Sequence, residues 1–222
     1  MRIYLNLTPN TEIVPFNYQQ YLVGAFHKWL GENELHDDIS LYSLSWLNGG
    51  HKVRQGLLFP DGADFFISSP LKDLHTKLVQ GVFDGAYIRW GMSVKEVTMR
   101  VTPDFGTRHR FIAESPIFIQ RRIEGRKQQK YYFPQDPEAN ELLTETLQRK
   151  LARAELPTDV SVAFDPDYRG VHTKKVTYGN IGIKAAYHPV IVNGHPRAVQ
   201  AAWEMGVGNS TGIGFGALNH TL

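Results

Sequence analysis

A glycine-rich segment near the C-terminus is the most distinctive motif of this sequence: Gly206-Val-Gly208-Asn-Ser-Thr-Gly212-Ile-Gly214-Phe-Gly216. A phosphate loop of the nucleotide-hydrolase type would end in Gly-Lys-Ser/Thr, and no lysine occurs here. A dinucleotide-binding fingerprint would lie between a strand and a helix, whereas this segment follows a predicted helix. Two interpretations stay open. The backbone N–H groups could cradle phosphates, or the glycines could allow tight packing between two domains.

A basic segment precedes this motif, although the net charge of the whole chain is only +2. Seven basic and two acidic residues give a local charge of +5 between Arg108 and Lys130. Acidic stretches at residues 32–38 and 136–145 compensate for it. Such segregation indicates an anionic partner, although a solvated loop is the more common explanation of a charge run.

The composition is that of a folded globular protein, with 42% apolar and 21% charged residues. The absence of cysteine excludes disulfides, thiolate zinc sites and a cysteine nucleophile, and agrees with a cytoplasmic location. The sequence contains no apolar run long enough to predict a membrane span.

The first half of the sequence predicts two helices among short strands. One helix is expected from about Asn17, as its cap, to Leu30. His27 lies off its apolar stripe, and Gly24, one turn earlier, leaves the surface beside His27 without a side chain. A second helix opens at Ser69-Pro70. Strands are expected at Arg2–Leu7, Leu41–Leu47, Asp64–Ser68 and Val94–Val101.

The second half repeats this order less regularly. Helices are expected from Asp136-Pro137 to about Ala154 and over about Pro196–Met205. Strands are expected at Ile112–Gln120, Val160–Phe164, Gly182–Val192 and Gly214–Leu218. The pattern predicts an α+β protein built of tandem ferredoxin-like, or RNA-recognition-like, β-α-β-β-α-β units. A boundary near Thr107 would divide an N-terminal domain, residues 1–106, from a C-terminal domain, residues 107–222.

A chain of two such units that ends in G-x-G-x-x-x-G-x-G-x-G resembles the repeat-processing endoribonucleases of CRISPR systems, in the RAMP superfamily. The N-terminal part agrees with this resemblance. Pro15-Phe-Asn-Tyr-Gln-Gln-Tyr-Leu-Val-Gly24, followed by Leu35-His36-Asp37 and Leu41-Tyr42-Ser43, is similar to the opening helix of the family and the loop into its second strand.

The resemblance implies a metal-independent endoribonuclease that binds CRISPR precursor RNA and releases guide RNAs by cutting within each repeat. In this reaction the 2′-hydroxyl attacks the adjacent phosphate and leaves 2′,3′-cyclic phosphate and 5′-hydroxyl ends. One group must take the 2′ proton, another must protonate the leaving oxygen, and donors or cations must stabilise the phosphorane. The matched positions are His27 and His36, without a choice between base and acid. No cofactor and no metal are expected.

The sequence departs from the family at one point. Some members carry a lysine shortly after the loop histidine, where this chain has Asp37-Asp38-Ile39-Ser40. Lys28, or Lys52 with Arg54, could supply the charge, and Tyr42 and Ser43 could donate hydrogen bonds. The residues predicted to bind RNA are Arg121, Arg122, Arg126, Lys127, Lys130, Gly206, Gly208, Gly212, Gly214 and Gly216, with His172, Lys174 and Lys175 as a weaker extension.

Other functions remain open at this stage. A non-catalytic RNA-binding subunit of a CRISPR effector complex would share the fold and the glycine-rich segment. A metal-dependent hydrolase could use His27, His36 and Asp37 or Asp38, although the sequence lacks H-E-x-x-H. Besides CRISPR repeat RNA, the partners compatible with the resemblance are other effector subunits and a second copy of the chain.

Overall fold

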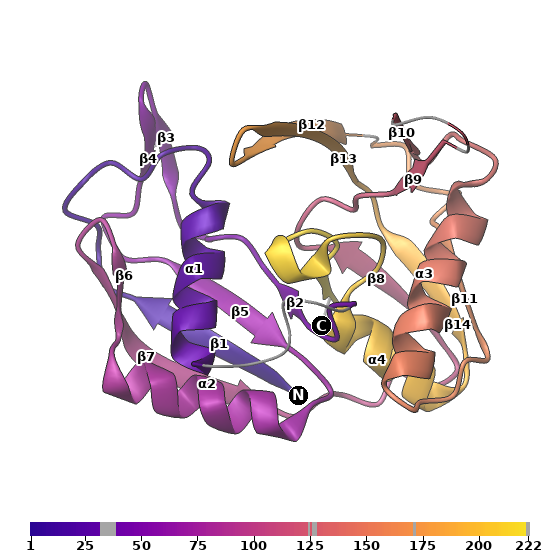
Figure 1. The fold of residues 1–222 in the computed structure, drawn as a ribbon, viewed down its shortest axis with the longest axis horizontal. Coiled ribbons are helices and arrows are strands. Elements are labelled where there is room, and N and C mark those ends of the chain that lie inside the picture. The colour runs from indigo at the N-terminus through magenta and orange to yellow at the C-terminus, as the bar shows by residue number, and fades with distance from the viewer. Residues whose placement is uncertain (32–38, 124, 126–127, 171, 221–222) are drawn as a thin grey trace.

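The computed structural model describes residues 1–31, 39–123, 125, 128–170 and 172–220. Two antiparallel sheets, one from each half of the chain, form the framework (Figure 1). Each sheet belongs to one β-α-β-β-α-β unit, so the predicted tandem ferredoxin-like fold is confirmed. The domain boundary near Thr107 stays a prediction; residue 107 lies between the last strand of the first sheet and the first strand of the second.

The N-terminal sheet has the strand order β2-β5-β1-β7-β6. Without the edge strand β6, this is the order in which a ferredoxin-like unit places its four strands. Ile3 of β1 lies opposite Ile67 of β5 and Met99 of β7. The elements of this half are β1 (Arg2–Leu7), α1 (Gln19–Leu30), β2 (Ser43–Leu44), β3 (His51–Val53), β4 (Gly56–Leu58), β5 (Asp64–Ser68), α2 (Lys72–Asp84), β6 (Tyr87–Arg89) and β7 (Met92–Arg100).

The C-terminal sheet has the equivalent order β11-β14-β8-β15. Two hairpins, β9–β10 and β12–β13, are inserted into this unit. Each forms a separate two-stranded sheet. The elements are β8 (Arg108–Ala113), β9 (Gln120–Arg122), β10 (Gln129–Tyr131), α3 (Ala139–Arg153), β11 (Val160–Phe164), β12 (His172–Tyr178), β13 (Ile181–Tyr187), β14 (Val190–Gly194), α4 (Pro196–Met205), the 3-10 turn η1 (Thr211–Ile213) and β15 (Leu218–Asn219).

Several predicted boundaries were wrong. The expected strand Ile112–Gln120 is divided between β8 and β9, because Ser115-Pro116 interrupts it. The expected strand Gly182–Val192 is divided between β13 and β14 at His188-Pro189. The strand expected at Leu41–Leu47 is only Ser43–Leu44, and the last strand lies at Leu218–Asn219 rather than Gly214–Leu218. The helix expected from Asn17 begins at Gln19 without a side-chain cap.

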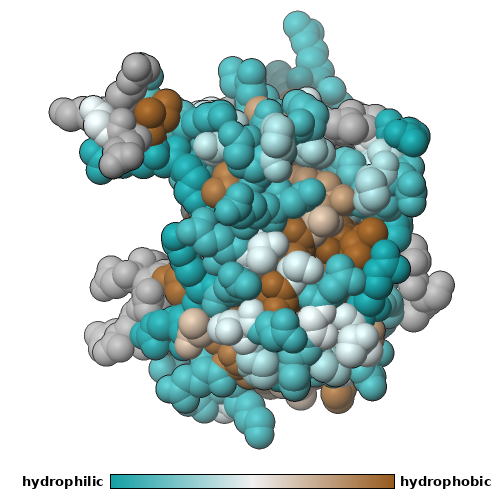
Figure 2. All heavy atoms as spheres, turned by 90° about the vertical axis from the view of Figure 1, so that its right-hand side faces the viewer, coloured by the Kyte–Doolittle hydropathy of each residue, from teal (hydrophilic) through white to brown (hydrophobic). Residues whose placement is uncertain are grey.

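Both buried clusters contain residues of the two halves, the first to the greater extent. The cluster under α1 and α2 contains Ile3, Leu5 and Phe26, and the C-terminal half completes it with Phe118, Val176, Ile183, Ala185 and Phe215. The second cluster lies under α3 and α4 and contains Leu143, Leu147 and Trp203. Seen from the C-terminal half, the surface is mostly hydrophilic, with hydrophobic residues in separate patches (Figure 2). Within the described ranges, no helix is long and apolar enough to cross a membrane.

Arg2 ties the first strand to the end of the chain. Its side chain is fully buried, with the guanidinium carbon 3.6 Å from the ring centre of Phe66 and 3.5 Å from that of Trp203. Its Nη2 donates hydrogen bonds to the carbonyl oxygens of Trp203, at 3.1 Å, and Leu218, at 2.7 Å. Strand β1, helix α4 and strand β15 are therefore held at one point.

Candidate functional site

His27 lies in the last turn of α1, where a cation is favourable to the helix dipole. Its ring centre is 5.1 Å from that of Phe26, and the Phe26 ring centre is 4.8 Å from that of Tyr42, the residue directly before β2. A Cβ placed on Gly24 would meet nothing within 4 Å, so the helix surface one turn before His27 is open, as the sequence predicted. His36 lies outside the described residues.

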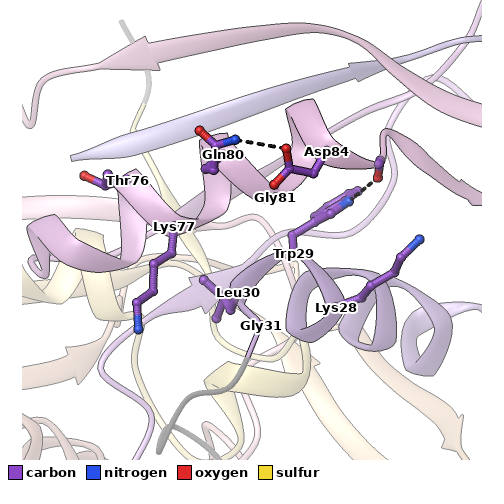
Figure 3. Close-up of a pocket in the computed structure, with 10 residues that line it drawn as sticks. Lys28, Trp29, Leu30, Gly31, Thr76, Lys77, Gln80, Gly81 and Asp84 are labelled. Atoms are coloured by element: carbon purple, nitrogen blue, oxygen red, sulfur yellow. Dashed lines mark hydrogen bonds between the residues drawn. The ribbon is translucent and has the colours of Figure 1, made fainter.

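Lys28 faces a cavity of about 530 Å³ between α1 and α2. Lys28 and Lys77 extend from the two helices at different sides of this cavity (Figure 3). The helices approach closely at Gly81, where an added Cβ would lie 1.9 Å from the carbonyl oxygen of Trp29. Neither Tyr42 nor Ser43 lines this cavity, so the structure does not bring Lys28 together with them here.

Tyr42 and Ser43 are buried at strand β2. Ser43 Oγ donates a hydrogen bond of 3.1 Å to the carbonyl oxygen of Glu204 in α4. Burial raises the pKa of Tyr42 to about 12, although its hydrogen bond with Ser40 acts in the opposite direction. Tyr42 is therefore a neutral phenol at physiological pH, and Ser43 joins β2 to the C-terminal half.

The glycine-rich loop, residues 206–216, packs against protein on both sides. An added Cβ on Gly208 would lie 2.6 Å from the carbonyl oxygen of Phe118, and one on Gly216 would lie 1.9 Å from that of Val207. At Gly212, a Cβ would lie 2.3 Å from Ser40 Oγ and 2.9 Å from Tyr42 Oη. Gly206 and Gly214 are also closely approached and, like Gly208 and Gly216, have positive φ. Close approach of backbone or side chains therefore explains these glycines, and contact of the loop with RNA stays a prediction.

A buried lysine that the sequence analysis did not single out holds this loop. Lys150 Nζ donates to Thr211 Oγ1 at 2.7 Å and to the carbonyl oxygens of Met205 at 3.0 Å and Gly206 at 3.4 Å. Burial lowers the pKa of Lys150 to about 7. The helical spacing of the sequence could have predicted this burial. Lys150 lies on the same face of α3 as Leu143 and Leu147, and a lysine is rarely buried on such a face unless it has a partner.

The basic segment forms the β9–β10 hairpin beside α3. Arg122 and Lys130 are exposed, and Lys130 Nζ lies 4.5 Å from the ring centre of Tyr132 and 3.6 Å from Glu138 Oε1. Arg126 and Lys127 lie outside the described residues. Arg121 is bound within the protein: its guanidinium donates to Gln120 O, Asn209 Oδ1, Leu142 O, Glu145 Oε2 and Thr146 Oγ1.

A groove of about 970 Å³ separates the N-terminal half from the β12–β13 hairpin. Its lining residues include Lys52, Lys174 and Lys175, and Glu114 is the one carboxylate in the part of the lining that the structure describes. Lys174 Nζ lies 4.4 Å from the ring centre of Trp46 and 5.8 Å from that of Tyr187, and burial lowers the pKa of Lys174. In Figure 1 the hairpin extends across the space between the two halves. The groove thus combines lysines that are far apart in the sequence.

Lys175 and Lys184 lie directly opposite each other in the register of this hairpin, and both are exposed. Like charges directly opposite in an antiparallel pair destabilise it. An anion bound between them would remove this repulsion. Among the described residues, no three His, Asp or Glu side chains are grouped to hold a metal ion, and the expectation of a metal-free site stays a prediction.

Comparison with known proteins gives one family and a set of similar structures. Residues 100–220 match the family model described as CRISPR associated protein Cas6, C-terminal. No curated protein matches the chain. A solved structure described as a Cas6-related gene product from Pyrococcus furiosus has 19% identity and a TM-score of 0.86, covering 99% of this chain and 97% of its own.

Two further solved structures are similar over almost the whole length of both chains. One, described as a RAMP protein binding different RNA substrates, has 19% identity, a TM-score of 0.86 and 100% coverage of both chains. The other, described as CRISPR associated protein Cas6, has 21% identity, a TM-score of 0.82 and coverage of 100% of this chain and 99% of its own. At these identities the likeness shows that the fold is the same.

Proposed function

Because the chain belongs to the Cas6 family of CRISPR-associated proteins, we propose that it binds CRISPR precursor RNA and cleaves it within each repeat. The 2′-hydroxyl attacks the adjacent phosphate without a metal ion, and the products carry 2′,3′-cyclic phosphate and 5′-hydroxyl ends. This reaction releases guide RNAs from the precursor. A similar solved structure is described as binding different RNA substrates, which supports RNA as the ligand.

The main support for RNA binding is the groove between the N-terminal half and the β12–β13 hairpin. Lys52, Lys174 and Lys175 line it, together with the carboxylate of Glu114. Lysines bind phosphates mainly through their charge, and the exposed ring of Phe16, which also lines the groove, offers a face for an unpaired base. A single strand is therefore the form of RNA that suits this groove, while Arg122 and Lys130 on the β9–β10 hairpin contact phosphates farther along.

His27 and His36 carry the proton transfers in this proposal, and either imidazole is suited to act as base or as acid. The open helix surface at Gly24 leaves room for the RNA backbone beside His27. Tyr42 is buried, with its hydroxyl next to Ser40 and Gly212, and it packs on Phe26 beside His27. Ser43 and Arg121, whose donors already have acceptors in the protein, hold β2 and the β9–β10 hairpin in place.

The test is single-turnover cleavage of the repeat RNA that belongs to the same genome, with the product ends mapped. His27→Ala and His36→Ala should each lower the rate by ~10²-fold or more, as expected for loss of a general acid or base, while RNA affinity changes little. His51→Ala, an exposed histidine of β3, is the matched control and should cut normally. A repeat with a 2′-deoxynucleotide at the cut should bind but stay intact.

Three outcomes would contradict parts of this proposal. Binding without cleavage by the parent protein would favour a non-catalytic RAMP subunit. Normal cleavage by both histidine variants would refute the assignment of the catalytic residues. Loss of activity in excess EDTA, restored by a divalent ion, would replace the metal-free mechanism by a metal-dependent one.

A further inference from the structure

The ammonium of Lys150 is an unusual connection between the C-terminal helices and the glycine-rich loop. Its three N–H groups have three acceptors, two at the C-terminal end of α4 and one on Thr211. Thr211 Oγ1 in turn donates a hydrogen bond of 2.9 Å to the carbonyl oxygen of Tyr42. One buried charge therefore joins α3, α4, the loop and strand β2.

Among the residues that the structure describes, no carboxylate pairs with this charge. On α3, the carboxylate of Glu145 pairs with Arg149 and Arg121. On α4, Glu204 pairs with Arg197 at 2.9 Å and accepts from Thr102 at 2.6 Å. The facing groups on β2 and the loop are the neutral Tyr42 and Thr211, and Arg149 is the other charged residue that lines the adjoining cavity of about 240 Å³. The ammonium is thus stabilised by neutral acceptors and by the end of the α4 dipole.

The loop that Lys150 holds is connected to His27 through the rings of Tyr42 and Phe26. Gly212 contacts Ser40 and Tyr42, and the Tyr42 ring packs on Phe26, next to His27. On the other side of the loop, Trp46 Nε1 donates a hydrogen bond of 2.6 Å to the carbonyl oxygen of Gly214. A displacement of the loop would therefore move Ser40 and Tyr42 and change the environment of Trp46.

We propose that Lys150 is a positioning residue, which latches the glycine-rich loop onto strand β2 and so fixes Ser40 and Tyr42 beside His27. The latch is made by the charged form. A neutral amine has one N–H fewer and loses one of the three contacts. The positioning of the active site rests on the proposed function, whereas the latch itself does not.

The latch is tested without RNA, by titrating the fluorescence of Trp46 between pH 6 and pH 9. A Trp46→Phe variant identifies the Trp46 part of the signal. The parent protein should show a step near pH 7, where Lys150 titrates, and Lys150→Met should lose it. Arg149→Met, the neighbouring exposed residue, should keep it. Lys174, which lies over Trp46, is present in all these proteins, so its effect cancels in the comparison.

Thr211→Val is the second variant and covers the case in which Lys150→Met does not fold. It removes one acceptor of the ammonium, which disfavours the charged form, so the step should move to lower pH. An unchanged step in Thr211→Val, or the same titration in the parent and Lys150→Met, would overturn the latch.

Single-turnover cleavage then tests the positioning. Lys150→Met should lower the rate ~10-fold while the affinity for the repeat RNA stays within about twofold, because the residue acts on the geometry of the site rather than on binding. A parent-like rate in Lys150→Met would overturn the positioning role. If the parent itself does not cut although the fluorescence step is present, the proposed function fails and the latch stands.

Discussion

Gly212 is a residue at which a single carbon atom should matter. A Cβ there would lie 2.3 Å from Ser40 Oγ and 2.9 Å from Tyr42 Oη, so Gly212→Ala should force the loop away from β2 and lower the free energy of unfolding by ~1–3 kcal/mol. Urea denaturation measures the change. Gly24→Ala is the matched control: with open space around it and a helical backbone, it should stabilise α1 by ~0.5–1 kcal/mol. Equal effects of the two substitutions would contradict this packing.

Lys150 should also make the stability depend on pH in one direction. The folded pKa of about 7 lies below the ordinary value of 10.5, so between these two pH values only the unfolded chain keeps the proton. The free energy of unfolding should therefore gain up to about 1.4 kcal/mol per pH unit from this residue above pH 7, and nothing below it. Urea titrations at several pH values measure the slope. Lys150→Met should remove this contribution, and parallel curves for the two proteins would refute it.

At the scale of the elements, the β12–β13 hairpin should show opposite effects on stability and on binding. Replacing both Lys175 and Lys184 by Gln removes a repulsion between cross-strand partners, so the RNA-free protein should become more stable by ~0.2–1 kcal/mol. The same change should weaken binding of a single-stranded RNA. The slope of log K against log salt should fall by ~0.7 for each lost phosphate contact.

The control for the hairpin is Lys72→Gln, an exposed lysine at the start of α2. It should leave both the stability and the salt dependence unchanged. A double variant that is less stable and binds RNA as the parent does would contradict a phosphate-binding role for this hairpin.

The elements that local sequence signals determine were predicted well. The expected strands Arg2–Leu7, Asp64–Ser68 and Val160–Phe164 and the helix Pro196–Met205 have the same bounds in the structure. The two-residue turn Gly179-Asn180 was a usable signal for the β12–β13 hairpin, but β12 was missed because consecutive lysines break its alternation. Strand pairings over long sequence distances leave no such local signal.

The candidate site was predictable only in part for the same reason. The open surface at Gly24 followed from helical spacing, and Lys52, Lys174 and Lys175 were singled out as basic residues. Their meeting in one groove depends on how the hairpin packs on the N-terminal half, which no local pattern encodes. The assignment of the catalytic histidines came from the resemblance to a family and stays a prediction.

At the scale of the whole molecule, Arg2 should be important for the joint stability of both halves. Arg2→Met leaves the carbonyl oxygens of Trp203 and Leu218 without their donor and removes the stacking between two rings. The free energy of unfolding should fall by about 2 kcal/mol or more. Arg100→Met, an exposed arginine over Tyr4, should change it by less than about 0.5 kcal/mol. Denaturation followed by circular dichroism measures both, and equal losses would contradict the role of Arg2 in holding β1, α4 and β15 together.

The shared core has a consequence for the order in which the chain is made. The apolar cluster under α1 and α2 includes Phe118, Val176, Ile183, Ala185 and Phe215, which leave the ribosome long after the strands that they cover. During translation, part of the apolar surface of the first half therefore stays exposed to water until these residues have been synthesised. Contacts of such high sequence separation also slow folding, because long loops must close before they form. A nascent chain that stalls shortly after β7 should accordingly be a target for chaperones and proteases.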